Sequence, residues 1–93
     1  MAMFTIRVEL HDATWTDYNN LATQLGRQGI TDIIQADNGN RYKLPPAEYN
    51  YVGNATLDQV YNAVNKVAST LGKRFAVLAN EVTSRTWTGL SRV

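Results

Sequence analysis

The stretch FTIRVELH at residues 4–11 decides the fold of this 93-residue chain. Its apolar residues alternate strictly with polar ones, and a period of two is typical of a β-strand that is buried on one face only. The side chains predicted to face the core are Phe4, Ile6, Val8 and Leu10. Arg7, Glu9 and His11 are then expected on the opposite face.

Two segments with helical periodicity follow. Thr14 and Asp17 predict a capping box, an N-terminal signal that satisfies free amide groups of the first turn, before an apolar stripe at Trp15, Tyr18, Leu21, Ala22 and Leu25. Thr56 and Gln59 predict a second capping box, before a stripe that ends at Gly72. Trp15 and Tyr18 are expected in the core.

The remaining segments predict strands. A second strand is expected over residues 30–36, followed by Asp37-Asn38-Gly39-Asn40, which is typical of a tight hairpin turn. A third strand begins at Arg41, is interrupted by Pro45-Pro46 and resumes over residues 48–52. Residues 75–82 alternate again and form the fourth.

This order of elements predicts an α+β, ferredoxin-like βαββαβ fold in a single domain spanning residues 1–93. We expect a four-stranded antiparallel sheet in the order 4-1-3-2 with both helices on one face. The predicted inward-facing strand residues are Ile6, Val8, Ile33, Phe75 and Val77. Residues 83–93 form a C-terminal tail or an extra strand.

Composition limits the classes of function. The net charge of +1 argues against a strong non-specific nucleic-acid binder, while leaving room for a small RNA site. Without cysteine the chain has neither disulfides nor a thiolate metal site. The N-terminus lacks the pattern of a secretion signal, and no apolar run is long enough for a membrane span, so we expect a cytoplasmic protein without membrane contact.

The first candidate site combines Glu9, His11 and Asp12 at the end of the first strand. An imidazole can transfer protons near neutral pH, and a carboxylate can orient it or hold a cation. The alternative is a solvated His11 and an Asp12 that only helps the chain to turn. A single histidine without cysteine argues against zinc, and we predict no resident metal, with Mg²⁺ as an optional cofactor.

The second candidate site combines Arg41, Tyr42 and Lys43 with Tyr49 and Tyr51. Cations interleaved with tyrosines on a sheet are typical of single-stranded RNA platforms, where rings stack on bases and cations contact phosphates. Arg7 is expected to contribute a further phosphate contact. The alternative is cross-strand tyrosine packing, with Arg41 and Lys43 protecting a strand edge.

Several of these positions together resemble the GhoS family of type V antitoxins. The resemblance rests on Phe4-Thr5-Ile6-Arg7-Val8, Tyr18, Gly29-Ile30, Ile33-Ile34, Asp37-Asn38-Gly39, Leu44, Tyr49 and Thr56-Leu57. It implies a ferredoxin-like domain similar to the small CRISPR-associated nucleases, and a sequence-selective endoribonuclease that acts on a single-stranded messenger RNA encoding a membrane toxin.

The family's first-strand acidic residue would fall at Glu9. Asp12 would be the nearest counterpart of the strand-end aspartate of the CRISPR-associated nucleases, displaced by about two residues. The arginine-rich first helix of the antitoxin has no match here, where residues 20–23 read NLAT.

The competing hypothesis is a non-catalytic module, carried by a phage or plasmid, that binds and inhibits a host or defence complex. Trp87 in the tail is its candidate partner-binding residue, because aromatic anchors are enriched at binding hot spots. The alternative for Trp87 is packing on the domain itself. A homodimer is expected in either case, since the outer strands leave unpaired edges and residues 83–90 could add a strand to a partner.

Overall fold

The central strand of the molecule is β1 (Ala2–Leu10). A computed structural model describes all 93 residues and pairs β1 antiparallel with β4 (Glu48–Gly53) on one side and with β5 (Phe75–Val82) on the other. This three-stranded order, β4-β1-β5, reproduces two of the three predicted neighbour pairs of the sheet. The chain is therefore an α+β protein built on an antiparallel sheet.

The predicted fourth strand is not part of this sheet. β2 (Ile33–Gln35) pairs only with β3 (Arg41–Lys43), and the two form a separate ribbon. A single bridge between Thr31 and Asn50 connects the chain before β2 to β4. The third predicted strand is divided in two at Pro45-Pro46, because a proline has no N–H to donate to a neighbouring strand. β3 belongs to the ribbon and β4 to the sheet.

The hairpin turn of the ribbon is wider than the predicted tight turn. Ala36 donates its N–H to the carbonyl of Asn40, and Gly39 donates to Ala36, so the loop spans residues 36–40. Gly39 has φ +91°, whereas Asn38 does not enter the positive-φ region. The type of tight turn expected from Asn-Gly needs positive φ at both residues, which explains the difference.

Both predicted capping boxes are present. α1 (Trp15–Gly26) begins after Thr14, whose hydroxyl accepts from the Asp17 N–H while Asp17 accepts from the Thr14 N–H. α2 (Leu57–Ser69) begins after Thr56 with the same reciprocal bonds to Gln59. Neither helix is long and apolar enough to cross a membrane.

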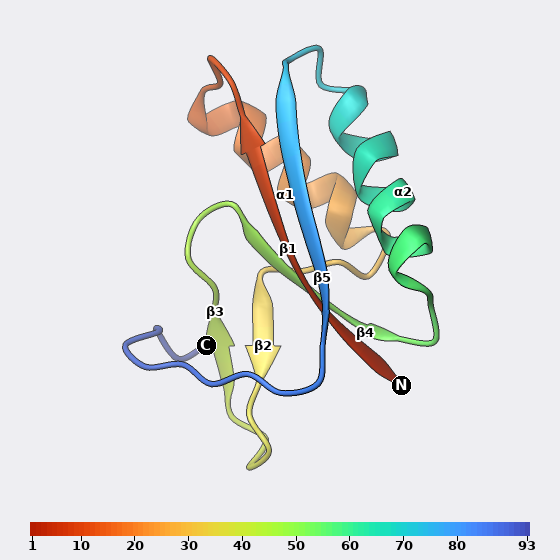
Figure 1. The fold of residues 1–93 in the computed structure, drawn as a ribbon. Helices are drawn as coiled ribbons and strands as arrows, with labels where there is room; N and C mark the ends of the chain where they lie inside the picture. Colours follow the sequence, from red (N-terminus) through yellow and green to blue (C-terminus); the bar gives the residue numbers. More distant parts are fainter.

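The core lies between the helices and one face of the sheet, and Figure 1 shows both helices on that side. It combines the inward residues of β1 with the apolar stripes of the helices: Phe4, Ile6, Val8, Leu10, Leu21, Leu25, Val60, Val64, Val67 and Ala68. Phe75 and Val77 pack against this cluster while half-buried. In β2 the buried residue is Ile34, and Ile33 is only half-buried, because the short ribbon runs in a register of its own.

Trp15 was expected in the core and is instead 76% exposed. It is the first residue of α1, and the side chains that reach the sheet begin one turn later at Tyr18 and Leu21. The helical stripe is therefore shorter at its N-terminal end than the sequence spacing predicts.

The C-terminal tail, residues 83–93, pairs with the ribbon of its own chain. Lys43 donates its N–H to the Ser91 carbonyl at 2.9 Å, and Val93 donates to the Arg41 carbonyl at 2.9 Å. Figure 1 shows the tail turning from the end of β5 toward β3. The outer edge of β5 has no paired strand, and the predicted homodimer stays a prediction.

Truncation of Phe4 to alanine tests this core. Phe4 is fully buried on the central strand, so Phe4→Ala should lower the free energy of unfolding by about 3–5 kcal/mol in urea denaturation. Leu78→Ala is the control on β5, where the side chain is 60% exposed and the loss should stay within about 0.5 kcal/mol. Equal losses for the two variants would contradict the assignment of the buried face.

Candidate functional site

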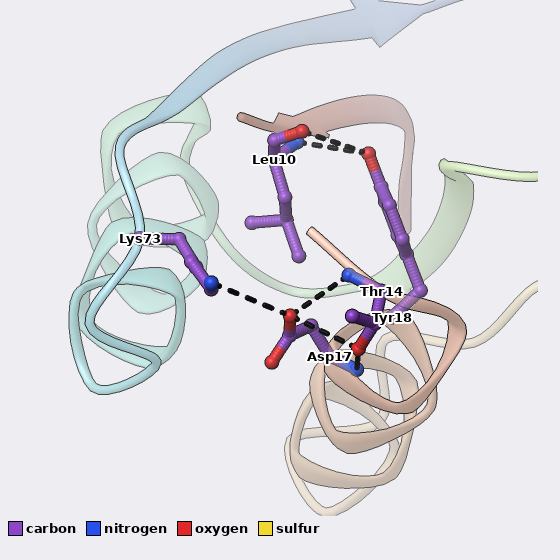
Figure 2. Close-up of polar contacts among 5 residues, drawn as sticks. All are labelled: Leu10, Thr14, Asp17, Tyr18 and Lys73. Carbon is purple, nitrogen blue, oxygen red and sulfur yellow. Dashed lines mark hydrogen bonds and ion pairs between the residues drawn. The ribbon is translucent and has the colours of Figure 1, made fainter. Parts of the chain in front are cut away.

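The end of β1 is held by the phenol of Tyr18. Its hydroxyl accepts a hydrogen bond from the Leu10 N–H at 2.9 Å and donates to the Leu10 carbonyl at 3.3 Å, as Figure 2 shows. A side chain of α1 thus replaces the neighbouring strand that would otherwise bind these backbone groups. The position of the last strand residue is fixed relative to the helix.

The start of α1 is held by a second set of contacts beside the first. Asp17 accepts from Thr14 and lies 3.9 Å from Lys73 Nζ (Figure 2). The hydrogen bond from the Thr14 backbone is the main reason that the pKa of Asp17 lies below its usual value. Residues 11–13 therefore form a short connection between two fixed points.

Glu9 and His11 form the only contact between candidate catalytic residues. Glu9 Oε1 lies 4.0 Å from His11 Nε2, and both side chains are exposed on the open face. The His11 N–H donates to the Arg74 carbonyl at 2.8 Å, which extends the pairing of β1 by one residue. A carboxylate and an imidazole in this relation can accept and donate protons to a ligand that lies on the sheet.

Asp12, the third residue of the first candidate site, and Arg7, the predicted phosphate contact, have different surroundings. Asp12 is exposed in the turn after β1, with φ +53°, an uncommon conformation for a residue other than glycine. Arg7 is exposed on the same face as Glu9, opposite Leu78 of β5 and Glu48 of β4, and makes no ion pair. It is free to contact an anion.

The donor set does not build a metal centre. No three histidine, aspartate or glutamate side chains lie together as a group of metal ligands. Glu9 and His11 could at most share a cation such as Mg²⁺ with solvent or substrate oxygens.

The second predicted cluster lies at the other end of the molecule. Figure 1 places the end of β1 at the top and β3, which carries Arg41, Tyr42 and Lys43, in the lower part. Lys43 is paired with Asp32 at 3.1 Å, and Arg41 is exposed without an ion pair. The two clusters are therefore separate sites.

Tyr49 was expected to stack on RNA, and the structure corrects this. Its side chain is 4% exposed and belongs to the core, because β4 directs it to the same face as Ile6, its partner on β1. Burial, with smaller effects of Asp32 and Tyr18, raises the pKa of Tyr49 to about 12. Its ring cannot meet a base while the protein is folded.

Trp87 packs on Tyr42 instead of standing free. The two rings meet edge to face, with centroids 5.7 Å apart and an angle of 63° between the planes. Sequence reasoning missed their neighbour Arg85, whose guanidinium donates to Thr5 Oγ1 at 2.9 Å and to Asn50 Oδ1. The only signal in the sequence was its position two residues before Trp87, in a segment without periodicity.

No protein-family model matches the chain, and no curated protein is similar to it in sequence. The resemblance to the GhoS antitoxins thus stays an expectation that rests on the residues quoted for it.

The burial of Tyr49 predicts a specific dependence on pH. Unfolded Tyr49 loses its phenolic proton near its ordinary value of 10.0, while the folded residue keeps the proton up to about 12. The native state therefore binds more protons over this interval, and stability should fall as the pH rises through it.

Thermal unfolding across this pH range, with a titration of phenolate absorbance, measures the effect. Tyr49→Phe should reduce the loss of stability, whereas Tyr61→Phe, at a residue that is 44% exposed, should leave it unchanged. Ionisation of all five tyrosines together near pH 10 would show that Tyr49 is accessible.

Proposed function

We propose that this protein is a GhoS-like antitoxin that cleaves single-stranded messenger RNA, with Glu9 and His11 as its acid–base pair. The observation that supports the proposal most directly is the 4.0 Å contact between these two side chains on an open sheet face. Both side chains are exposed, so an extended polynucleotide could reach the pair without a conformational change. Positioning and charge stabilisation would supply most of the catalysis.

A ferredoxin-like fold agrees with this proposal. β5, β1 and β4 occupy three of the four strand positions, and both helices pack on one face of the sheet. The proposal assigns the segment at the Thr31–Asn50 bridge to the fourth position, next to β4. In this description the hairpin of β2 and β3 is an extension of the outer strand.

In the proposed reaction the Glu9 carboxylate accepts the proton of a ribose 2′-hydroxyl as the 2′-oxygen attacks the adjacent phosphorus. The bond between phosphorus and the 5′-oxygen breaks, and protonated His11 gives its proton to that leaving oxygen. The products are a 2′,3′-cyclic phosphate and a free 5′-hydroxyl. Arg7 offsets the charge that develops on the phosphate. Asp12, exposed in the turn that follows β1, adds a second carboxylate near the proposed cleavage site.

Single substitutions test these roles. His11→Ala and Glu9→Gln should each lower cleavage of a mixed RNA pool by ~10²-fold or more, since each removes one proton-transfer group. Arg7→Ala and Asp12→Asn should have smaller effects on the rate. The melting temperature should barely change, because all four side chains are exposed.

The matched control is Glu81→Gln, which alters an exposed glutamate on β5, opposite Phe4 of β1. It should retain full activity. Reactions with Mg²⁺ and with a chelator show whether a cation takes part. If the wild-type protein cleaves no RNA under either condition, or if His11→Ala and Glu9→Gln retain its activity, the proposed function is wrong.

A specific observation favours the second candidate function, a non-catalytic module that inhibits a host or defence complex. Trp15 is 76% exposed beside a groove of about 390 Å³, whose walls include Tyr18, Ala22, Leu44, Pro45 and Pro46. Tryptophan is enriched at binding hot spots, and its ring here has little contact with the protein itself. Trp15 therefore replaces Trp87 as the candidate anchor.

This second function predicts a contrast between the two tryptophans. A complex retained by the wild-type protein should be lost by Trp15→Ala and kept by Trp87→Ala in a co-purification experiment. The opposite result would assign the partner surface to the tail. A complex that both variants retain would exclude a tryptophan anchor.

A further inference from the structure

A concave pocket of about 400 Å³ lies between the C-terminal tail and the hairpin of β2 and β3. We call it the tail pocket. Its walls include Met3 of β1, Asp37 of the hairpin loop, Tyr42 of β3, and Arg85 and Trp87 of the tail. Neither the Glu9–His11 pair nor the Trp15 groove shares a residue with it.

The guanidinium of Arg85 supplies a positive charge to this pocket without a counterion. Its three hydrogen bonds go to uncharged oxygens, those of Phe4 O, Thr5 Oγ1 and Asn50 Oδ1, and it forms no ion pair. An arginine has five N–H donors, so the Nε–H and one Nη2–H have no partner in the protein. Partial burial lowers the pKa of Arg85. An anion in the pocket would stabilise such a half-buried cation through charge-assisted hydrogen bonds.

The aromatic pair supplies a surface of another kind. Trp87 and Tyr42 are both half-buried and meet edge to face, an arrangement that leaves ring faces uncovered by the pair itself. Rings that are partly open beside a cation are the two elements of single-stranded nucleic-acid sites, where bases stack and phosphates meet arginine or lysine. The tail pocket brings both elements together.

The wall of the pocket also contains an acidic residue. The carboxylate of Asp37 is the only acidic group in the wall. It can accept a hydrogen bond from a ribose hydroxyl, the group by which proteins distinguish RNA from DNA.

We propose that the tail pocket binds one nucleotide of single-stranded RNA, with the base stacked on Trp87 and the phosphate held by Arg85. The inference rests on the proposed function for the choice of RNA as ligand, but not on the chemistry of cleavage. Arg85 binds Thr5, and Glu9 lies four residues further along the same face of β1, about 13 Å away at the rise of a β-strand. The pocket would therefore fix the substrate at a distance from the cleaved bond.

Binding of labelled oligo(U) and oligo(A) RNA, measured by fluorescence anisotropy, tests the proposal. The His11→Ala background is used throughout, so that cleavage does not shorten the probe. Trp87→Ala should weaken binding by about tenfold or more, the loss expected for one stacked base, while Trp87→Phe should keep most of the affinity. Trp15→Ala is the matched control and should bind as the parent does.

Arg85 needs a second readout, because it also joins the tail to the sheet. Arg85→Gln keeps hydrogen-bonding groups and removes the charge. The plot of log affinity against log salt concentration should therefore become less steep, by the contribution of about one phosphate contact. Arg85→Lys should restore that slope. Thermal unfolding of both variants shows whether the tail pocket still forms.

The outcomes separate this inference from the proposed function. RNA binding that is unaffected by Trp87→Ala would overturn the pocket assignment and leave cleavage by Glu9 and His11 standing. Binding that depends on Trp87 in a protein without nuclease activity would support the pocket and remove the proposed reaction. No RNA binding, or tighter binding of single-stranded DNA of the same sequence, would overturn the inference.

Discussion

The alternation of β1 is the constraint on which the rest of the structure depends. β1 is the only strand with a neighbouring strand on both sides, and its inward residues form the centre of the core. Its outward residues do not take part in the core and make other contacts: Thr5 binds Arg85 of the tail, and Glu9 contacts His11. A shift of one residue in the register would exchange the two faces. The core and both proposed RNA contacts thus depend on one period-two pattern.

Asn50 links the three parts of the molecule. On β4 it faces the open side of the sheet, where its Oδ1 accepts from Arg85 and its Nδ2 donates to the Ile33 carbonyl at 3.0 Å. Its backbone forms the bridge to Thr31. Sheet, ribbon and tail therefore meet at one uncharged side chain, and the tail pocket exists because the tail is held across the open face at this point.

Local signals in the sequence predicted most of the elements, and long-range contacts account for what they missed. The capping boxes at Thr14 and Thr56 each depend on two residues three positions apart, so the pattern is visible in the sequence itself. The separation of β2 and β3 from the sheet depends on how far strand pairing continues beyond Pro46, which no local pattern specifies. Tyr49 was misplaced because a tyrosine suits either face of a sheet, and only its pairing with Ile6 of β1 puts it on the buried face. Arg85 was missed because its partners, Thr5 and Asn50, are 80 and 35 residues away.

The central claim is that RNA binds to the face of β1 that carries the tail pocket. The two tryptophan indole N–H resonances provide the most direct test, because Trp87 lies in the tail pocket and Trp15 beside the separate groove on α1. In a titration of ¹⁵N-labelled His11→Ala protein with oligo(U), the account predicts that the Trp87 indole signal shifts, together with the backbone amides of Tyr42 and Arg85, while the Trp15 indole signal stays in place. A shift confined to Trp15, or no shift at either indole, would contradict it.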